Sequence, residues 1–150
     1  MSSVHNTRAM YGGADEEVEF EEQGSASFAF VDGSKYEGDW VQIDNKRLRH
    51  GRGTYVDGSD TYEGEWHMDA IQGSGTYKYG SGAVYEGSWK QNEMCGEGTY
   101  KWVDGASYSG NWQGSKMHGK GQYTDPESVK WEGEFFNGKF FNGKAYVSLR

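Results

Sequence analysis

The chain of 150 residues carries a formal net charge of −8 and contains 24 Gly, one Cys and one Pro. Only 34% of it is hydrophobic and 16% is aromatic, which leaves too few aliphatic residues for the closed core of a β-sandwich. The single Cys excludes an internal disulfide, and the acidic balance argues against sequence-independent nucleic-acid binding. Because the sequence shows no signal peptide, lipidation motif or apolar stretch of membrane length, it predicts a soluble, cytoplasmic protein.

Residues 1–23 form an acidic segment with a net charge of −5, which leaves −3 for the rest of the chain. Against the single basic residue Arg8, its acidic residues are Asp15, Glu16, Glu17, Glu19, Glu21 and Glu22. A segment with many like charges and few apolar residues favours disorder, so we predict an acidic, mostly disordered tail over residues 1–23. Such a tail increases solubility or, alternatively, docks onto a basic partner.

From residue 24 onward the chain repeats a pattern with two parts. The first part places a glycine between two aromatic residues, as in Tyr85-Glu86-Gly87-Ser88-Trp89. It recurs with leading aromatic residues at positions 36, 62, 85, 108 and 131, so the steps are 26, 23, 23 and 23. A fixed period over five copies indicates a repeat array.

The second part follows after six linker residues and reads Gly-x-Gly-x-Tyr, as in residues 96–100. Each part alternates with period two, so we expect two strands that form an antiparallel hairpin. A ring across the bare backbone of a glycine restores the contact area that the glycine lacks. The register that follows pairs each ring with a glycine or another ring: Trp89 with Gly96, Gly87 with Gly98, Tyr85 with Tyr100 and, one repeat earlier, Trp66 with Gly73.

Both ends of the array depart from this pattern. Residues 24–33 resemble the second part of a repeat, with Gly24, Ala26 and Phe28 at the Gly-x-Gly-x-Tyr positions, and predict an N-terminal cap strand. In the fifth repeat one extra residue shifts the second part to residues 143–147. The register expected there pairs Phe135 with Gly143, Gly133 with Ala145 and Trp131 with Val147. Both ends then carry Ala in place of the second Gly, which we interpret as capping.

Tyr-Glu-Gly-x-Trp followed by Gly-x-Gly-x-Tyr at a 23-residue step resembles the MORN repeat, and the resemblance covers about residues 24–150. Residues 119–135 also resemble the end of a very short MORN-repeat protein of ciliated and sperm cells. The family implies an all-β fold that consists of an elongated single-layer antiparallel sheet of tandem β-hairpins. It also implies an aromatic groove along this sheet, and scaffold work rather than catalysis. We therefore expect about five hairpins and an N-terminal half repeat over residues 24–150.

The aromatic groove is the expected functional site. A single-layer sheet leaves one face partly open, and exposed apolar surface on a protein often marks a binding site that Tyr and Trp dominate. Tyr79 and Trp102 lie two residues beyond the repeated pattern and should enrich the middle of the groove. The predicted partner-binding residues are Tyr62, Trp66, Tyr77, Tyr79, Tyr85, Trp89, Tyr100, Trp102, Tyr108 and Trp112.

These residues predict a non-enzymatic protein-interaction scaffold. The family resemblance points to protein partners in a cytoskeletal assembly, above all the axoneme of the cilium or flagellum. Two alternatives are a module that binds membrane phospholipid and a regulatory module of a larger enzyme complex. The net charge of −3 outside the tail and the lack of a Lys/Arg cluster disfavour the phospholipid.

Catalysis and cofactor binding are not expected. Residues 114–120 match the start of a phosphate-binding loop, but Gly121 stands where Ser or Thr is needed, and the pattern continues as a strand. The four His residues lack metal-ligand spacing, and the Glu residues recur on the polar face at the repeat period. We therefore predict no catalytic residue, no metal site and no cofactor.

Overall fold

The computed structural model describes residues 8–10 and 17–146 of the chain. These residues form thirteen strands, which are β1 (Arg8–Met10), β2 (Glu17–Glu19), β3 (Glu22–Ala29), β4 (Lys35–Ile43), β5 (Lys46–Asp57), β6 (Asp60–His67), β7 (Ala70–Lys78), β8 (Val84–Lys90), β9 (Glu93–Lys101), β10 (Ser107–Gln113), β11 (Lys116–Thr124), β12 (Lys130–Phe136) and β13 (Lys139–Tyr146). The described residues contain no helix.

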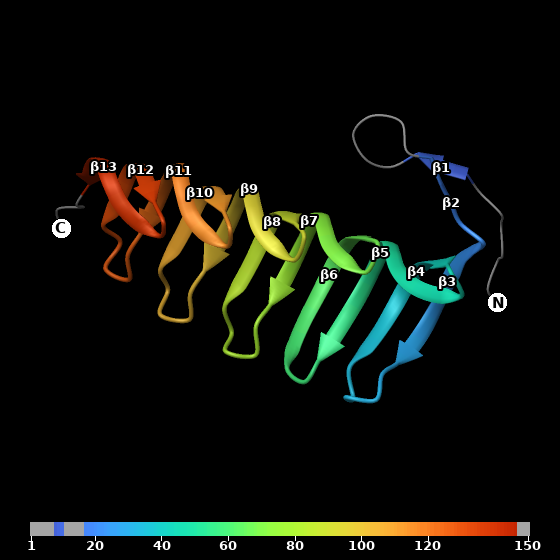
Figure 1. The fold of residues 1–150 in the computed structure, drawn as a ribbon. Helices are drawn as coiled ribbons and strands as arrows, with labels where there is room; N and C mark the ends of the chain where they lie inside the picture. Colours follow the sequence, from blue (N-terminus) through green and yellow to red (C-terminus); the bar gives the residue numbers. More distant parts are fainter. Residues whose placement is uncertain (1–7, 11–16, 147–150) are drawn as a thin grey trace.

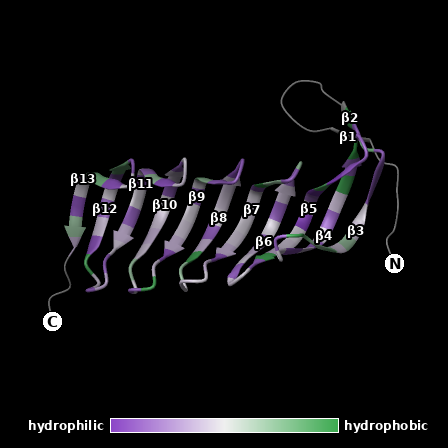
Figure 2. Cartoon of the chain, turned by 60° about the horizontal axis from the view of Figure 1, so that its bottom comes forward, coloured by the Kyte–Doolittle hydropathy of each residue, from purple (hydrophilic) through white to green (hydrophobic). Residues whose placement is uncertain are grey.

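The strands from β3 to β13 form one open antiparallel sheet in which each strand pairs with its neighbours in sequence. Figure 1 shows the sheet as an elongated row of hairpins, with the short β1–β2 pair near its β3 end. The predicted fold class is confirmed. The middle strands show little of the strongest hydropathy colour in Figure 2, because most of their large buried side chains are Tyr and Trp, with Ile71 and Met94 as exceptions.

Each hairpin closes through a turn of two residues, such as Gln91–Asn92 between β8 and β9. Both residues of this turn have positive φ, 50° and 66°. This is the backbone geometry of a type I′ turn, whose twist matches the twist of the flanking strands. Most of the predicted six-residue linker is therefore strand.

The predicted register is confirmed at the glycine and tyrosine pairs and wrong at the tryptophan. Gly87 pairs with Gly98 and Tyr85 with Tyr100, but Trp89 pairs with Met94 because the ladder shifts between Gly87 and Trp89. Trp66 likewise pairs with Ile71. The glycines assigned to these rings pair with the next hairpin instead: Gly73 with Trp89 and Gly96 with Trp112.

The predicted register of the fifth repeat is also wrong. Gly133 pairs with Gly143, Trp131 with Ala145 and Phe135 with Phe140. The turn at Asn137–Gly138, where both residues have positive φ, closes the hairpin earlier than expected, so the partner of Gly133 lies two residues earlier and that of Phe135 three residues earlier. Ala145 therefore does not replace the second glycine of this repeat, and the capping interpretation fails at this end.

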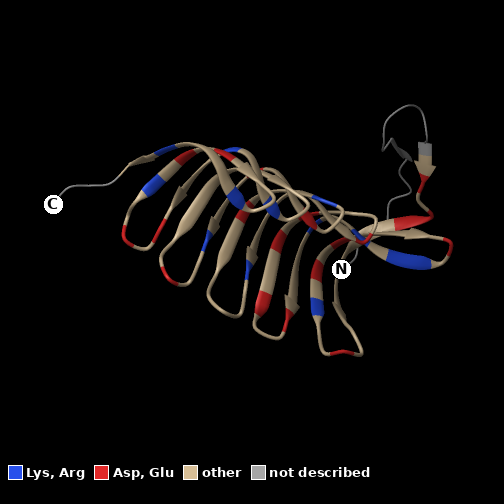
Figure 3. Cartoon of the chain, turned by 60° about the vertical axis from the view of Figure 1, so that its left-hand side comes forward, with Lys and Arg blue, Asp and Glu red and all other residues tan. Residues whose placement is uncertain are grey.

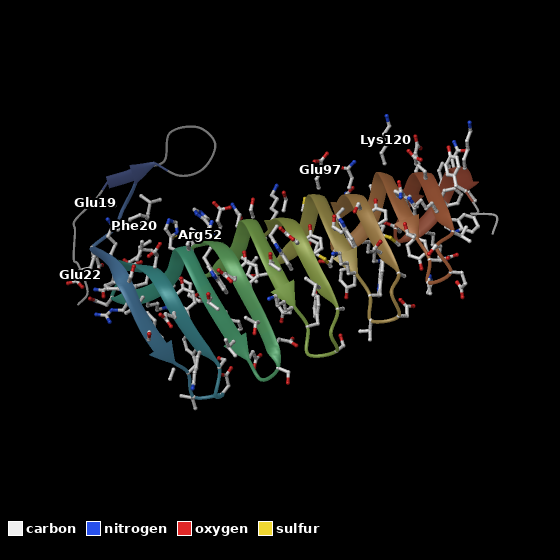
Figure 4. The ribbon with its side chains drawn as sticks, turned by 180° about the vertical axis from the view of Figure 1, so that it is seen from behind. Glu19, Phe20, Glu22, Arg52, Glu97 and Lys120 are labelled. Carbon is white, nitrogen blue, oxygen red and sulfur yellow. The ribbon has the colours of Figure 1, made fainter. Side chains whose placement is uncertain are left out.

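The N-terminal cap strand is confirmed, since in β3 Gly24 pairs with Trp40, Ala26 with Gly38 and Phe28 with Tyr36. The strand begins at Glu22, two residues before the predicted start of the array. Phe20, which lies in the predicted tail, is 2% exposed and packs edge-on against the His50 ring at 5.3 Å between centroids. Figure 4 shows Phe20 near the start of β3. Residues 1–7 and 11–16 of the predicted tail lie outside the described residues.

The first tyrosine of a hairpin lies across the second glycine of the facing strand. Tyr85 is fully buried, and a Cβ atom on Gly98 would lie only 2.5 Å from its Cζ atom. The Tyr85 hydroxyl then donates a hydrogen bond of 2.8 Å to the carbonyl of Ser88. The same contacts join Tyr62 to Gly75 and Tyr108 to Gly121, so every central repeat uses a glycine to make room for a ring.

The indole hydrogen bonds between hairpins run in one direction. The Trp89 indole donates to the carbonyl of Gly75 at 3.2 Å, and the Trp112 indole donates to the carbonyl of Gly98 at 3.0 Å. In both cases the donor belongs to the later hairpin and the acceptor to the earlier one. The turns are bonded in both directions, because the Asn92 N–H donates to the Ile71 carbonyl at 3.0 Å and the Ile71 N–H donates to Asn92 Oδ1 at 2.8 Å.

The opposite face of the sheet is polar. Glu and Thr alternate from strand to strand along one row, which runs Glu37, Thr54, Glu63, Thr76, Glu86 and Thr99. Figure 4 shows Glu97 and Lys120 extending away from the sheet. Polar residues also line a hollow of about 1030 Å³ over the middle strands.

Candidate functional site

The aromatic face of the sheet has an inner layer that is fully buried. Six of the ten predicted partner-binding residues lie in it and are 0–6% exposed: Tyr62, Trp66, Tyr85, Trp89, Tyr108 and Trp112. Their rings meet edge to face, as in the contact of 5.0 Å between the centroids of Tyr85 and Trp89. This is a favoured geometry for aromatic pairs, and the rings form the core of a sheet against which no second layer packs among residues 17–146. These side chains pack within the chain.

The remaining four predicted residues are half-buried and lie further out on the same face. With two neighbours they form a set that we call the outer aromatic row, which consists of Tyr55, Tyr77, Tyr79, Tyr100, Trp102 and Tyr123. From Tyr77 to Tyr123 the row is continuous. The centroid distances between successive rings are 4.4, 5.8, 4.7 and 5.7 Å.

The sequence prediction missed Tyr55 and Tyr123, although a signal for both was present. Each is the tyrosine of a Gly-x-Gly-x-Tyr segment, as Tyr77 and Tyr100 are. Tyr123 contacts Trp102 edge-on, and Tyr55 lies 5.9 Å from Trp66 between centroids. The repeat therefore extends the outer aromatic row beyond the middle hairpins.

The aromatic face is hollowed near its N-terminal half. A cavity of about 440 Å³ there is lined by Arg49, Tyr55, Trp66, Asp69, Ile71, Tyr77, Tyr79, Trp89, Asn92, Met94 and Ser115. Arg49 lies at one end, where its guanidinium carbon is 4.3 Å from the Trp66 ring centroid and its Nε donates to Asp69 at 2.6 Å. The Asp69 carboxylate thus compensates the arginine charge in this hollow. Tyr100 and Trp102 continue the row beyond the hollow.

Burial and neighbouring carboxylates raise the pKa of several hydroxyls on this face. Burial raises the pKa of Tyr79 to about 12, with a smaller effect from Asp60. Burial also raises the pKa of Tyr77, whose hydroxyl donates to Asp60 Oδ2 at 2.8 Å. The pKa of Tyr123 is raised by burial and then by Asp104, Asp125 and Glu127. All these tyrosines are neutral at pH 7.

These shifts predict that alkali unfolds the array. Burial raises the pKa of Tyr108 to about 12 from an ordinary value of 10.0. Because the unfolded chain loses these protons first, the contribution to stability is complete below pH ~10 and is lost as the pH rises towards ~12. We expect tyrosinate absorbance and sheet circular dichroism to change together in this window. Ionisation of all 11 tyrosines at pH ~10 while the circular dichroism stays constant would contradict the assignment.

The described residues include no cluster of three or more His, Cys, Asp or Glu side chains placed to hold a metal ion. Cys95 is a free, half-buried thiol in β9. The part of the chain that the structure describes also has no helix long and apolar enough to cross a membrane.

A family model for the MORN repeat matches residues 48–60, 62–84, 85–107 and 108–128, which together make up more than half of the chain. The last three matches begin at the leading aromatic residues of the predicted repeats. The matched segments do not include β4 or β13, although both strands continue the same sheet. No curated protein matches the chain, so the likeness of residues 119–135 to a protein of ciliated and sperm cells stays a prediction. MORN repeats are non-catalytic interaction modules, and this chain belongs to the MORN-repeat family.

Proposed function

We propose that the protein is a scaffold whose outer aromatic row binds a segment of a protein partner. The observation that carries this proposal is the difference in burial between the two aromatic layers. The inner rings are 0–6% exposed, whereas the outer rings are half-buried and form a continuous apolar strip. Tyr and Trp dominate interface energies, and a strip of them that no other described segment covers is suited to binding a partner.

The form of the partner segment follows from the chemistry of this face. Inner strands have their backbone groups paired on both sides in the sheet, so the face presents side chains and not free N–H or C=O groups. A partner that lies on it must satisfy its own backbone hydrogen bonds. An amphipathic helix does so, and helix-in-groove docking is a recurrent mode of recognition. Because MORN repeats mediate protein and membrane-lipid interactions, phospholipid is the alternative ligand.

Trp102 is the residue with which to test this proposal. It contacts Tyr100 and Tyr123 at the surface and is absent from the buried core. We expect Trp102→Ala to weaken partner binding by ~2 kcal/mol, or roughly thirtyfold in Kd, with a small effect on stability. The measurement is quantitative proximity labelling or pull-down from the native cell, followed by affinity measurement with each recovered partner.

Deletion of residues 1–19, which keeps the buried Phe20, is the competing variant. If the acidic tail only adds long-range attraction, its removal changes the salt dependence of binding and leaves the contact itself intact. Loss of binding on tail deletion, together with unchanged binding by Trp102→Ala, would instead make the tail the functional element. Localisation of a tagged copy in the same cells tests the further proposal of a cytoskeletal role in the axoneme of a cilium or flagellum.

A further inference from the structure

Carboxylates flank the outer aromatic row on both sides. Asp57 and Asp60 lie at the turn between β5 and β6, where Asp60 accepts hydrogen bonds from the Tyr77 hydroxyl and from the Gly80 N–H. Asp104 and Glu127 lie in the links after β9 and β11, close enough for their charges to act on the Tyr123 hydroxyl. Figure 3 shows acidic residues at the tips of the loops that link successive hairpins, except at the link between β7 and β8.

The charges along the row have a pattern. The link between β7 and β8, residues 79–83, carries no charged side chain of its own, and Asp60 reaches it from the β5–β6 side through the Gly80 N–H. Lys78 and Lys101 each follow a tyrosine of the row and therefore point to the opposite face, since strand side chains alternate. Arg49 is paired with Asp69. The outer aromatic row thus has an apolar centre and an acidic group at each end.

On the basis of the proposed function, we propose that the partner segment is an amphipathic helix with an apolar centre and with Lys or Arg near both ends. Charge complementarity carries this choice, because basic side chains over the two acidic ends would gain both carboxylate and cation–π contacts. The acidic ends of the row require a positively charged ligand, whereas vesicles rich in anionic lipid are negatively charged.

The dimensions of the sheet set the length of this helix. The turn after β5 and the link after β11 are separated by six strand spacings, which is roughly 29 Å. An α-helix rises 1.5 Å per residue, so a helix of about 20 residues spans this distance. The basic residues should therefore occupy the first and last turns of such a helix.

The inference can be tested with two synthetic peptides of about 20 residues. Both carry the same apolar helical face, and their terminal turns carry Lys in one peptide and Glu in the other. Affinity for the full 150-residue protein is measured by fluorescence anisotropy at roughly 0.02 M and 0.5 M salt. Vesicles that contain phosphatidylserine form a third arm.

A double variant that removes one charge at each acidic end, and a double control variant on the opposite face, test the position of the acidic ends. Asp57→Asn and Glu127→Gln are suitable because both residues are exposed. Glu63→Gln and Glu86→Gln are the matched controls, since they remove the same charge from exposed positions on the opposite face. We expect the double variant at the row to weaken binding of the basic peptide by roughly three- to tenfold at low salt, and the control pair to leave it unchanged.

The outcomes separate this inference from the proposed function. Preference for the basic peptide, loss of that preference at high salt and sensitivity to Trp102→Ala support both. Equal binding of the two peptides with sensitivity to Trp102→Ala overturns the charge assignment and leaves the aromatic site. The assignment is also overturned if the control pair weakens binding as much, if only the vesicles bind, or if the basic peptide does not bind. Binding that Trp102→Ala does not affect contradicts the proposed function itself.

Discussion

Trp89→Ala should lower the free energy of unfolding by about 3–5 kcal/mol, the range for removing a buried large aromatic side chain. Trp89 is 6% exposed, and its ring lies 5.0–6.1 Å from the ring centroids of Tyr85, Tyr62 and Tyr77. The substitution also leaves the Gly75 carbonyl without the indole donor. Because the sheet has one layer, no opposing layer is available to fill the resulting cavity. Urea unfolding followed by circular dichroism measures the loss.

Two controls make the Trp89 result specific. Trp89→Phe retains a ring but removes the hydrogen bond of the indole. Its effect on the free energy of unfolding should therefore be smaller than that of Trp89→Ala. The lost bond contributes about 1 kcal/mol, and the lost contact area adds to it. Trp102→Ala removes the same side chain type from the half-buried outer aromatic row. Equal destabilisation by Trp89→Ala and Trp102→Ala would show that the inner and outer layers are not distinct.

Gly98→Val should lower the free energy of unfolding by ~2–3 kcal/mol through overpacking. The ring of Tyr85 occupies the space in which the new side chain must fit, and a Cβ at this position lies only 2.5 Å from Cζ. The Tyr85 ring has little room to move, because its hydroxyl donates a hydrogen bond to the Ser88 carbonyl and the residue is fully buried. Thermal and urea unfolding of the variant check this expectation.

Glu97→Val is the matched control for the Gly98 prediction. It places the same β-branched side chain one residue away in β9, at an exposed position on the polar face. β-branched residues favour strands, so this variant should be neutral or slightly stabilising. If Gly98→Val unfolds at the same temperature as Glu97→Val, the ring does not lie across the glycine.

Much of this fold could be predicted from the repeat itself. The period of 23 residues sets the number of hairpins, and the alternation within each part assigns strands and faces. The Gly87–Gly98 and Tyr85–Tyr100 pairs follow, because only a glycine leaves room for a ring on the facing strand. These features depend on side-chain volume, which follows directly from the identity of each residue.

The tryptophan register could not be obtained in the same way, because it depends on the turn and on a bulge. The turn at Gln91–Asn92 contains no glycine, so the sequence gives no strong signal for the positive φ values that both residues adopt. The ladder then shifts between Trp89 and Gly87. In the fifth repeat a signal did exist: Asn137-Gly138 is a strong type I′ dipeptide and would have given the observed Phe135–Phe140 pair.

The sequence placed all ten predicted site residues on one face but could not separate them by depth. Tyr85 and Tyr100 are paired tyrosines of one hairpin, yet Tyr85 is fully buried and Tyr100 is half-buried. Depth is decided by which ring of the pair lies across a glycine, and here that ring is Tyr85, over Gly98. Binding of a partner by the outer aromatic row stays a prediction.

The indole hydrogen bonds make each hairpin depend on the one before it. Trp66, Trp89 and Trp112 each donate to a glycine carbonyl of the preceding hairpin. A deletion of part of a repeat would leave such an indole buried without its acceptor, which is a costly defect. A deletion of one whole repeat would bring an equivalent glycine carbonyl into place, because successive hairpins share the same glycine register. Arrays of this kind should therefore change length by whole repeats.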